Sequence, residues 1–201
     1  HLLKRSKQKG LVNAVLRNIQ RQWPELQAAI AAHPQLSHAH PRWLADAIHT
    51  HYPQQAAQVI AANNAQAPMW LRINEQHTTR DNYLALLAQA GIDALPQAPL
   101  SSAIQLLQAV DVQSLPHFAD GWVSVQDIAA QHAAYLLNAQ AGERILDCCA
   151  APGGKTAHIL ERQPTAQVLA IDVDEQRLTR VLDNLQRLGL QAQVQVADAT
   201  Q

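Results

Sequence analysis

The sequence is poor in cysteine and charge, and it has no long uninterrupted apolar run. Its only cysteines, Cys148 and Cys149, are adjacent, so they cannot provide the disulfide framework that small secreted domains use. No apolar segment approaches the roughly 20 residues that span a bilayer, and the first residues show no signal-peptide pattern. These absences exclude the membrane and secreted classes, and we expect a cytoplasmic protein that does not act at a membrane.

Hydrophobic residues make up 48% of the 201 residues and charged residues only 15%, which is typical of a globular protein. This length is enough for one large domain or two small ones. The chain opens on His1 instead of methionine and stops at Gln201, just after a strand-like stretch. We therefore expect it to be a piece of a longer protein.

The net charge of -1 hides a basic patch at the start of the chain. Six cations precede the first acid, Glu25: Lys4, Arg5, Lys7, Lys9, Arg17 and Arg21. A concentrated positive segment of this kind indicates contact with nucleic acid or another polyanion. The alternative is a solvated helix face.

The first 140 residues predict mostly helices and a few strands. Apolar residues from Leu11 to Ile19 repeat with a helical period, and Pro41 suits the start of a second helix that ends near Pro53. Further helices are expected at 54–63, after Thr78 or Thr79, and at 127–139; strands are expected at 69–74, 103–110 and 121–126. We interpret residues 1–23 as the end of a helical domain and 24–120 as a small α+β module.

From Gly142 onward, strands and helices alternate regularly. Strands at 144–149, 168–173 and 192–198 are separated by helices at 153–161 and 174–189, the second of which Gly189 can close. Strand, helix, strand, helix, strand is the βαβαβ half of a doubly wound sheet. The fold class is therefore α/β, with residues 121–201 forming the first half of a Rossmann-like domain.

The residues that follow these strands define a candidate binding site, because ligands of doubly wound sheets lie beyond the carboxyl ends of the strands. In the segment DCCAAPGGKT, Gly153 and Gly154 allow close backbone approach at the start of a helix, and Pro152 fixes the turn. Asp172 ends the second strand and can accept the hydroxyls of a ribose, whereas Asp198 can reach the region of an adenine.

Two familiar phosphate motifs do not fit this loop. A P-loop requires glycine where Cys149 stands, and a dinucleotide fingerprint requires G-x-G-x-x-G, whereas only adjacent glycines occur. A nucleoside with little phosphate fits better, which points to S-adenosylmethionine as the cofactor. A nicotinamide-dependent dehydrogenase is the weaker alternative.

Three segments, ILDCCAAPGGKTAHILE, AIDVDEQRLTRVLDNLQRLG and VADAT, closely resemble the RNA cytosine-C5 methyltransferases, in particular those of bacterial 16S ribosomal RNA. RINEQHTTRDNYLALLAQAGI and DGWVSVQDIAAQ are similar to the segment before the catalytic domain of that group, and KGLVNAVLRNIQRQ to the last helix of its NusB-like RNA-binding domain. The resemblance implies methylation of carbon 5 of a cytosine in 16S ribosomal RNA. The cofactor residues that it implies are Cys149, Ala150, Ala151, Pro152, Gly153, Gly154, Lys155, Asp172 and Asp198.

The catalytic residues of this family have no counterpart among the 201 residues. The family adds a cysteine thiolate to carbon 6 of the cytosine, which makes carbon 5 able to attack the methyl group. That cysteine sits in a Thr-Cys dipeptide and a second cysteine follows a proline, and neither dipeptide occurs here. We therefore assign no catalytic residue, expect the nucleophile beyond Gln201, and expect these residues alone to be inactive and to leave a sheet edge uncovered. The alternative function is a non-catalytic RNA-binding and ribosome-assembly module that holds the cofactor.

Three groups of side chains have both a functional and a structural interpretation. For Cys148 and Cys149 we favour packing as small residues over a redox or metal role, since CC lacks the spacing of a zinc site. We expect no metal at the clustered histidines, which are His33, His38, His40, His49 and His51, because no cysteine or carboxylate set accompanies them. For Trp43, Trp70 and Trp122 we favour buried packing over base stacking. Nothing in the sequence indicates an obligate protein partner.

Overall fold

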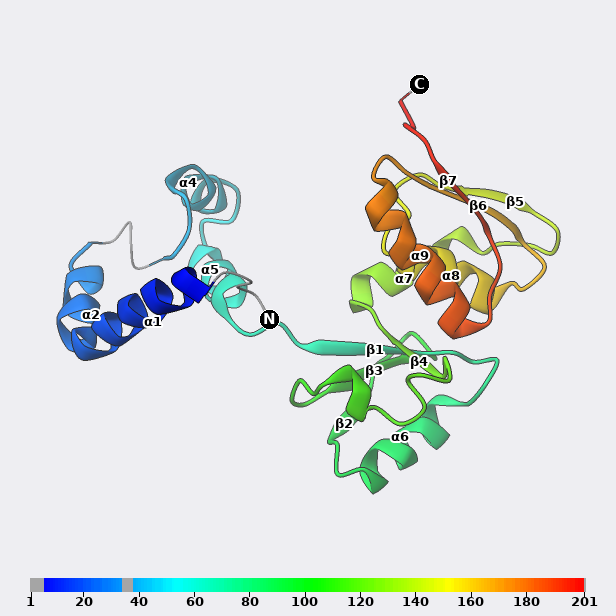
Figure 1. The fold of residues 1–201 in the computed structure, drawn as a ribbon, viewed down its shortest axis with the longest axis horizontal. Coiled ribbons are helices and arrows are strands. Elements are labelled where there is room, and N and C mark those ends of the chain that lie inside the picture. The colour runs from blue at the N-terminus through cyan, green and yellow to red at the C-terminus, as the bar shows by residue number, and fades with distance from the viewer. Residues whose placement is uncertain (1–5, 34–37, 201) are drawn as a thin grey trace. The chain divides into compact units, whose positions relative to one another are not determined.

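The computed structural model describes residues 6–33 and 38–200 as two compact units, residues 1–66 and 67–201 (Figure 1). The expected division of the chain at residues 23 and 120 stays a prediction. Among the described residues, no helix combines the length and apolar character needed to cross a membrane.

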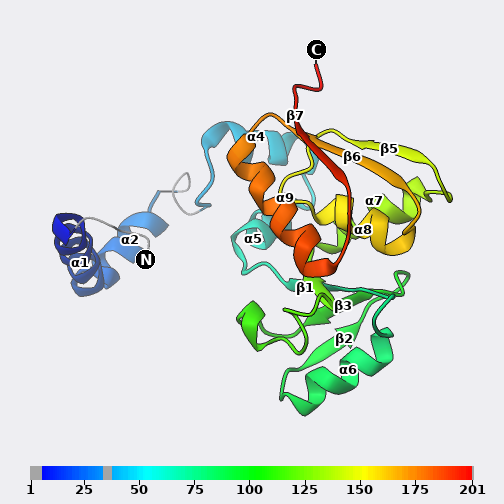
Figure 2. The ribbon, with the colours of Figure 1, turned by 45° about the vertical axis from the view of Figure 1, so that its right-hand side comes forward.

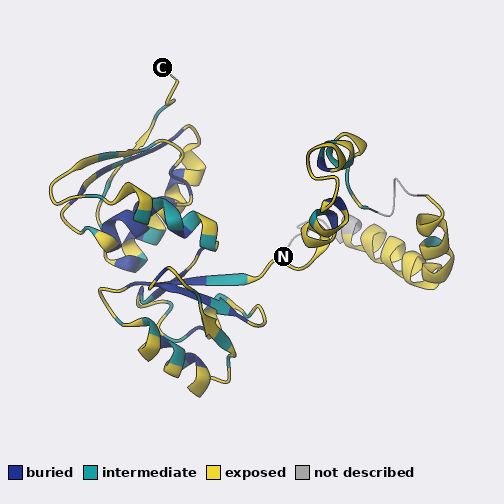
Figure 3. Ribbon diagram, turned by 180° about the vertical axis from the view of Figure 1, so that it is seen from behind, coloured by how far each residue is buried: buried dark blue, intermediate teal, exposed yellow. Residues whose placement is uncertain are grey.

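The first unit consists of helices. They are α1 (Ser6–Arg21), α2 (Trp23–Ala31), α4 (Arg42–His51) and α5 (Ala56–Asn64). The apolar stripe of α1 is exposed, with Leu11 at 68% and Leu16 at 53%, whereas Ile48, Ala56 and Ile60 form a small core between α4 and α5 (Figure 3). Of the basic patch, Lys4 and Arg5 lie outside the described residues. The helix α2 was not predicted; its early proline is tolerated because the first turn needs no amide donor there.

The second unit begins with a four-stranded antiparallel sheet. Its elements are β1 (Met69–Ile73), α6 (Arg80–Gln89), β2 (Ala94–Pro96), β3 (Ala103–Leu106), the short 3₁₀ helix η1 (Val112–Ser114) and β4 (Val123–Val125). The strand order is β2-β3-β1-β4. Thr79 caps α6 by accepting a hydrogen bond from the amide of Asn82, as predicted.

Side chains of β1, β3 and α6 form the core of this sheet. Leu71, Ile104 and Leu87 are fully buried, and so is Tyr83, whose hydroxyl donates to the carbonyl of Pro116 at 2.7 Å. Burial raises the pKa of Tyr83. The strands predicted at 69–74, 103–110 and 121–126 are confirmed, although β3 and β4 are shorter than expected; β2 was missed because three residues are too short to show a period.

The rest of the second unit contains the predicted βαβαβ pattern. The elements are α7 (Ile128–Leu137), β5 (Arg144–Asp147), α8 (Gly154–Arg162), β6 (Gln167–Asp172), α9 (Glu175–Leu188) and β7 (Gln193–Val196). The strands are parallel in the order β5-β6-β7, which confirms the α/β class and the partial Rossmann-like sheet. Asp174 caps α9 and Gly189 ends it in the left-handed conformation.

Helices cover one face of this parallel sheet (Figure 2). Val168 and Ala170 of β6 pack with Val181 and Leu185 of α9 in a single core. Leu146 of β5, which does not belong to this core, is 54% exposed. Residues at the amino ends of all three strands line a groove of about 900 Å³. Within the described residues β5 pairs with β6 alone, so one long edge of the sheet is open.

The buried His158 of α8 makes the stability of the fold depend on pH. Burial, with smaller contributions from the nearby Arg72 and Arg162, lowers the pKa of His158 to about 3. His158 therefore binds a proton below about pH 6.5 in the unfolded chain, but only below about pH 3 in the folded state. Its contribution to the free energy of unfolding is complete above pH 6.5. It is lost by about 1.4 kcal/mol per pH unit as the pH falls toward 3.

We expect the free energy of unfolding to fall by about 2 kcal/mol more between pH 6.5 and 5 in the wild type than in His158→Gln. Urea unfolding at the two pH values measures this difference. Equal pH dependence in both proteins would show that His158 does not titrate between the folded and unfolded states.

Candidate cofactor-binding site

The glycine loop between β5 and α8 is shaped by close contact with α9. Gly153 has φ +96°, and a Cβ atom there would lie 3.2 Å from both Cα and Cγ1 of Val181. Side chains rarely adopt such a φ, so both the backbone and the space require glycine. The sequence predicted this glycine from approach to a ligand, whereas its nearest neighbour in the structure is a helix of the same domain.

The first turn of α8 offers backbone donors to a ligand. Gly153 is its N-cap and provides no side-chain cap, and the first turn contains no acid. Among the described residues no acceptor is found for the amides of Gly154, Lys155 or Thr156. Free amides at a helix N-terminus carry partial positive charge and attract an anion. The carboxylate of an amino-acid tail, as in S-adenosylmethionine, fits this donor set.

Asp172 connects the glycine loop to the end of β6. Its side chain is only 3% exposed, and it accepts hydrogen bonds from the amides of Ala151 and Asp174, both at 3.2 Å. Nη1 of Arg177 lies 3.4 Å from Oδ1, and Nη2 donates to the carbonyl of Ala151 at 3.1 Å. Arg177 therefore contacts both the carboxylate and the glycine loop. No feature of the sequence indicated Arg177.

Asp198 follows the end of β7 and is fully exposed. Its carboxylate accepts from the hydroxyl and the amide of Thr200 at 2.7 and 2.8 Å, and these hydrogen bonds lower the pKa of Asp198. Because Asp172 lies opposite Val196 in the parallel register, Asp198 stands two residues beyond that pair. The structure thus brings the glycine loop, Asp172 and Asp198 to one edge of the sheet.

The remaining predicted loop residues divide into buried and exposed positions. Ala150 and Ala151 are buried, and Pro152 and Lys155 are exposed. Cys148 and Cys149 are free and exposed, so the packing role that we expected for them is wrong.

Asp147 at the end of β5 was not predicted as a site residue, but it contacts the same loop. It accepts a hydrogen bond from the hydroxyl of Thr156 at 2.6 Å. This bond joins the strand end to the first turn of α8. A short side-chain bond across nine residues has no sequence signature.

The tryptophan prediction has a mixed outcome, whereas the expectation of no metal at the histidines stays a prediction. No group of three or more possible metal ligands exists among the described residues. Trp122 packs against the core of the first sheet and stacks on His117 with ring centroids 4.2 Å apart. Trp70 is half-buried, but Trp43 is 71% exposed, so burial of all three tryptophans was wrong.

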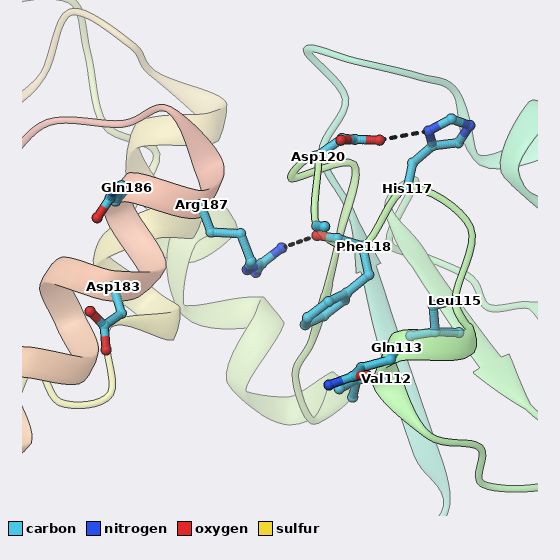
Figure 4. A pocket seen from close by; sticks show the side chains of 10 residues that line it. Val112, Gln113, Leu115, His117, Phe118, Asp120, Asp183, Gln186 and Arg187 are labelled. Atoms are coloured by element: carbon cyan, nitrogen blue, oxygen red, sulfur yellow. Dashed lines mark hydrogen bonds and ion pairs between the residues drawn. The ribbon is translucent and has the colours of Figure 1, made fainter.

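A groove of about 870 Å³ separates the η1 loop from the C-terminal half of α9 (Figure 4). Phe118 and Arg187 face each other across it, and Arg187 donates to the carbonyl of Phe118 at 2.7 Å. None of the predicted cofactor residues lines this groove. We place the candidate site at the glycine loop because the free amides and the strand ends converge there.

Comparison with solved structures defines the class. The chain matches a methyltransferase homolog from Pyrococcus horikoshii with a TM-score of 0.71 and 24% identity, over 82% of this chain and 54% of that one. The structure of NSun6 from the same organism with SFG matches with a TM-score of 0.70 and 15% identity, over 79% of this chain and 65% of that one. The fold is therefore that of a methyltransferase.

Two family models identify the chain more narrowly than the methyltransferase fold does. Residues 40–113 match the family model "Methyltr_RsmF/B-like, ferredoxin-like domain", and residues 134–201 match "16S rRNA methyltransferase RsmB/F". The chain belongs to this RsmB/F methyltransferase family. It is 57% identical to ribosomal RNA small subunit methyltransferase B of Vibrio cholerae over 98% of its length, and 55% identical to that of Serratia proteamaculans over 98%. It spans about half of these relatives, 45% and 46%.

Proposed function

We propose that the protein containing this chain methylates carbon 5 of a cytosine in 16S ribosomal RNA with S-adenosylmethionine as the methyl donor. The carrying observation is the first turn of α8, whose free amides lie at the same edge of the parallel sheet as the strand ends that precede or hold Asp172 and Asp198. Membership of the RsmB/F family supports the ribosomal RNA substrate, as do relatives named ribosomal RNA small subunit methyltransferase B. A cytoplasmic location follows from this substrate.

Each part of the site has a distinct task in this proposal. The amides of Gly154, Lys155 and Thr156 hold the carboxylate of the cofactor's amino-acid tail. Asp172 accepts the ribose hydroxyls, and Asp198 accepts from the adenine side. The bound cofactor supplies a methyl group on a sulfonium, which is a good leaving group for transfer to carbon.

The nucleophile for carbon 6 is not among these 201 residues in this proposal. Cys148 and Cys149 stand in the cofactor loop and lack the Thr-Cys and Pro-Cys contexts of the family. We propose that these residues provide the cofactor loop and RNA-facing modules and that another part of the full-length protein supplies the thiolate. The alternative is an assembly module that binds the cofactor without chemistry. It also predicts cofactor binding, but it predicts no methyl transfer.

Asp198→Asn should weaken binding of S-adenosylhomocysteine by the full-length protein about tenfold, because one charged hydrogen-bond acceptor is lost. Asp198 is exposed, so the melting temperature should change little. Calorimetric titration measures the affinity. Asp183→Asn, an exposed acid of α9 away from the loop, is the matched control and should bind like the wild type.

Failure of the wild-type protein to bind S-adenosylhomocysteine would refute the proposal. Binding without incorporation of methyl groups into 16S ribosomal RNA would favour the assembly module. Mapping of 5-methylcytosine in the product tests the position of the transferred methyl group.

A further inference from the structure

A charged side chain lies fully buried where the antiparallel sheet β1–β4 meets the cofactor domain, by which we mean the parallel sheet β5–β7 with helices α7, α8 and α9. Arg72 of β1 is 1% exposed, and its Nε and Nη2 donate to the two carboxylate oxygens of Glu161 in α8 at 2.8 and 2.7 Å. Burial raises the pKa of Glu161, and the guanidinium counteracts this shift. Removing two charges from water costs several kcal/mol, so a buried pair of this kind contributes little net stability. Its presence calls for a role besides stability.

The remaining nitrogen of Arg72 contacts the cofactor loop itself. Nη1 donates to the backbone carbonyl of Gly154 at 2.8 Å and to the side-chain oxygen of Gln126 at 2.6 Å. Gly154 is the first residue of α8 and one of the three residues whose free amides form the candidate site. The Arg72 side chain thus joins β1 to the peptide that presents those donors.

Both ends of α8 are held by the antiparallel-sheet module. Arg72 binds Gly154 at the N-terminus, and Gln76 donates to the carbonyls of Leu160 and Glu161 at 3.2 and 2.7 Å near the C-terminus. A helix that is fixed at two points cannot rotate or slide without breaking these bonds. The direction of its first-turn amides is therefore set from outside the cofactor domain.

A second arginine bridges the same boundary without touching the loop. Arg187 of α9 donates to the carbonyls of Phe118 and Val123 at 2.7 and 3.1 Å, and to the hydroxyl of Ser124 at 3.1 Å. It is comparable to Arg72 in charge and in number of bonds across the boundary. It therefore separates general adhesion of the two sheets from an effect on the cofactor loop.

We propose that Arg72 is a positioning residue, which fixes the Gly154 peptide and thereby the cofactor affinity of a domain to which it does not belong. This inference rests on the proposed function, because it assumes that the first turn of α8 binds S-adenosylmethionine. The antiparallel-sheet module then helps to orient the cofactor-binding loop, in addition to the RNA-facing role proposed for it. Glu161 holds the guanidinium in place, and the Nη1 bond to Gly154 carries the effect.

The double variant Arg72→Met/Glu161→Leu in the full-length protein tests this inference. Replacing a buried ion pair by apolar residues of similar volume usually preserves stability. It also removes the donor to Gly154. We expect a melting temperature near that of the wild type and affinity for S-adenosylhomocysteine weakened about tenfold, as for loss of a charged hydrogen bond. Calorimetric titration well below the melting temperature measures the affinity.

Three single variants keep the test decisive if the double variant is unstable. Glu161→Gln keeps one oxygen acceptor for the guanidinium and the Nη1 bonds of Arg72, so it should lose less affinity than the double variant despite a lower melting temperature. Arg187→Gln should also lower the melting temperature and leave the affinity unchanged. Arg72→Lys keeps the charge but cannot reach all its acceptors at once, and should bind with intermediate affinity.

Wild-type affinity in a folded double variant would overturn the inference, and so would equal loss of affinity in Arg187→Gln and Arg72→Lys. Both outcomes can be distinguished from failure of the proposed function, because the wild type itself would then not bind S-adenosylhomocysteine.

Discussion

Gly153→Ala is expected to weaken S-adenosylhomocysteine binding by about 100-fold or more and to lower the free energy of unfolding by about 2–3 kcal/mol. Two costs add at this position. A side chain disfavours φ +96°, and the new methyl group would lie 3.2 Å from the Cα atom of Val181. The backbone of α9 cannot rotate away as a side-chain tip can, so the loop has to shift.

The affinity loss follows from where that shift occurs. Gly153 is the N-cap of α8, so moving it reorients the amides of Gly154 and Lys155 that we assign to the cofactor. Titration calorimetry and urea unfolding of the full-length protein measure the two effects. Gly142→Ala is the control, because it has φ +75° but no atom within 4 Å of the added methyl group. It should lose about 1–2 kcal/mol and keep its affinity. Similar affinities for the two variants would disprove the assignment of this loop.

The fold of the cofactor domain was predictable because its signals are local and repeated. Strands of four to six residues alternate with helices whose ends carry recognisable residues, such as Asp174 at the start of α9 and Gly189 at its end. The order of parallel strands then follows from the crossover rule. The same reasoning brought Asp172 and Asp198 to one edge, since the carboxyl ends of parallel strands coincide.

The parts that could not be predicted depend on partners far away in the sequence. Arg72 and Glu161 are 89 residues apart, and an isolated charged residue is ordinarily expected at the surface. In the strand predicted at 69–74, Arg72 alternates with the apolar Leu71 and Ile73, and this pattern does not indicate a buried charge. Its burial becomes understandable only when α8 supplies the carboxylate and the Gly154 carbonyl.

What surrounds the candidate site was unpredictable for a similar reason. The sequence assigned Asp172 to a ribose, which stays a prediction, but it did not indicate that the carboxylate is buried and contacts Arg177. It predicted packed cysteines, but Cys148 and Cys149 are exposed. Both depend on which side of the loop other elements cover, and a motif of ten residues carries no information about that.

Gly121→Ala is expected to have the largest effect on stability of any glycine replacement in the second unit, about 3–5 kcal/mol. Gly121 precedes β4 and has φ +77°. An added Cβ atom would lie 2.8 Å from the carbonyl oxygen of Arg187 and 3.0 Å from the Cα atom of Leu188, both backbone atoms of α9. Contacts this short do not persist in folded proteins, so the chain before β4 must move away from α9.

That movement separates the two sheets at the boundary that Arg187 bridges. Its bonds to the carbonyls of Phe118 and Val123 lengthen together, because both acceptors flank Gly121. Gly91→Ala is the matched control: it has φ +72° with open space around the added methyl group, so it carries the backbone cost alone. Urea unfolding should therefore separate the two variants by about 2 kcal/mol or more. If Gly121→Ala lost no more stability than Gly91→Ala, the close approach of α9 to this loop would be incorrect, and the Arg187 bridge with it.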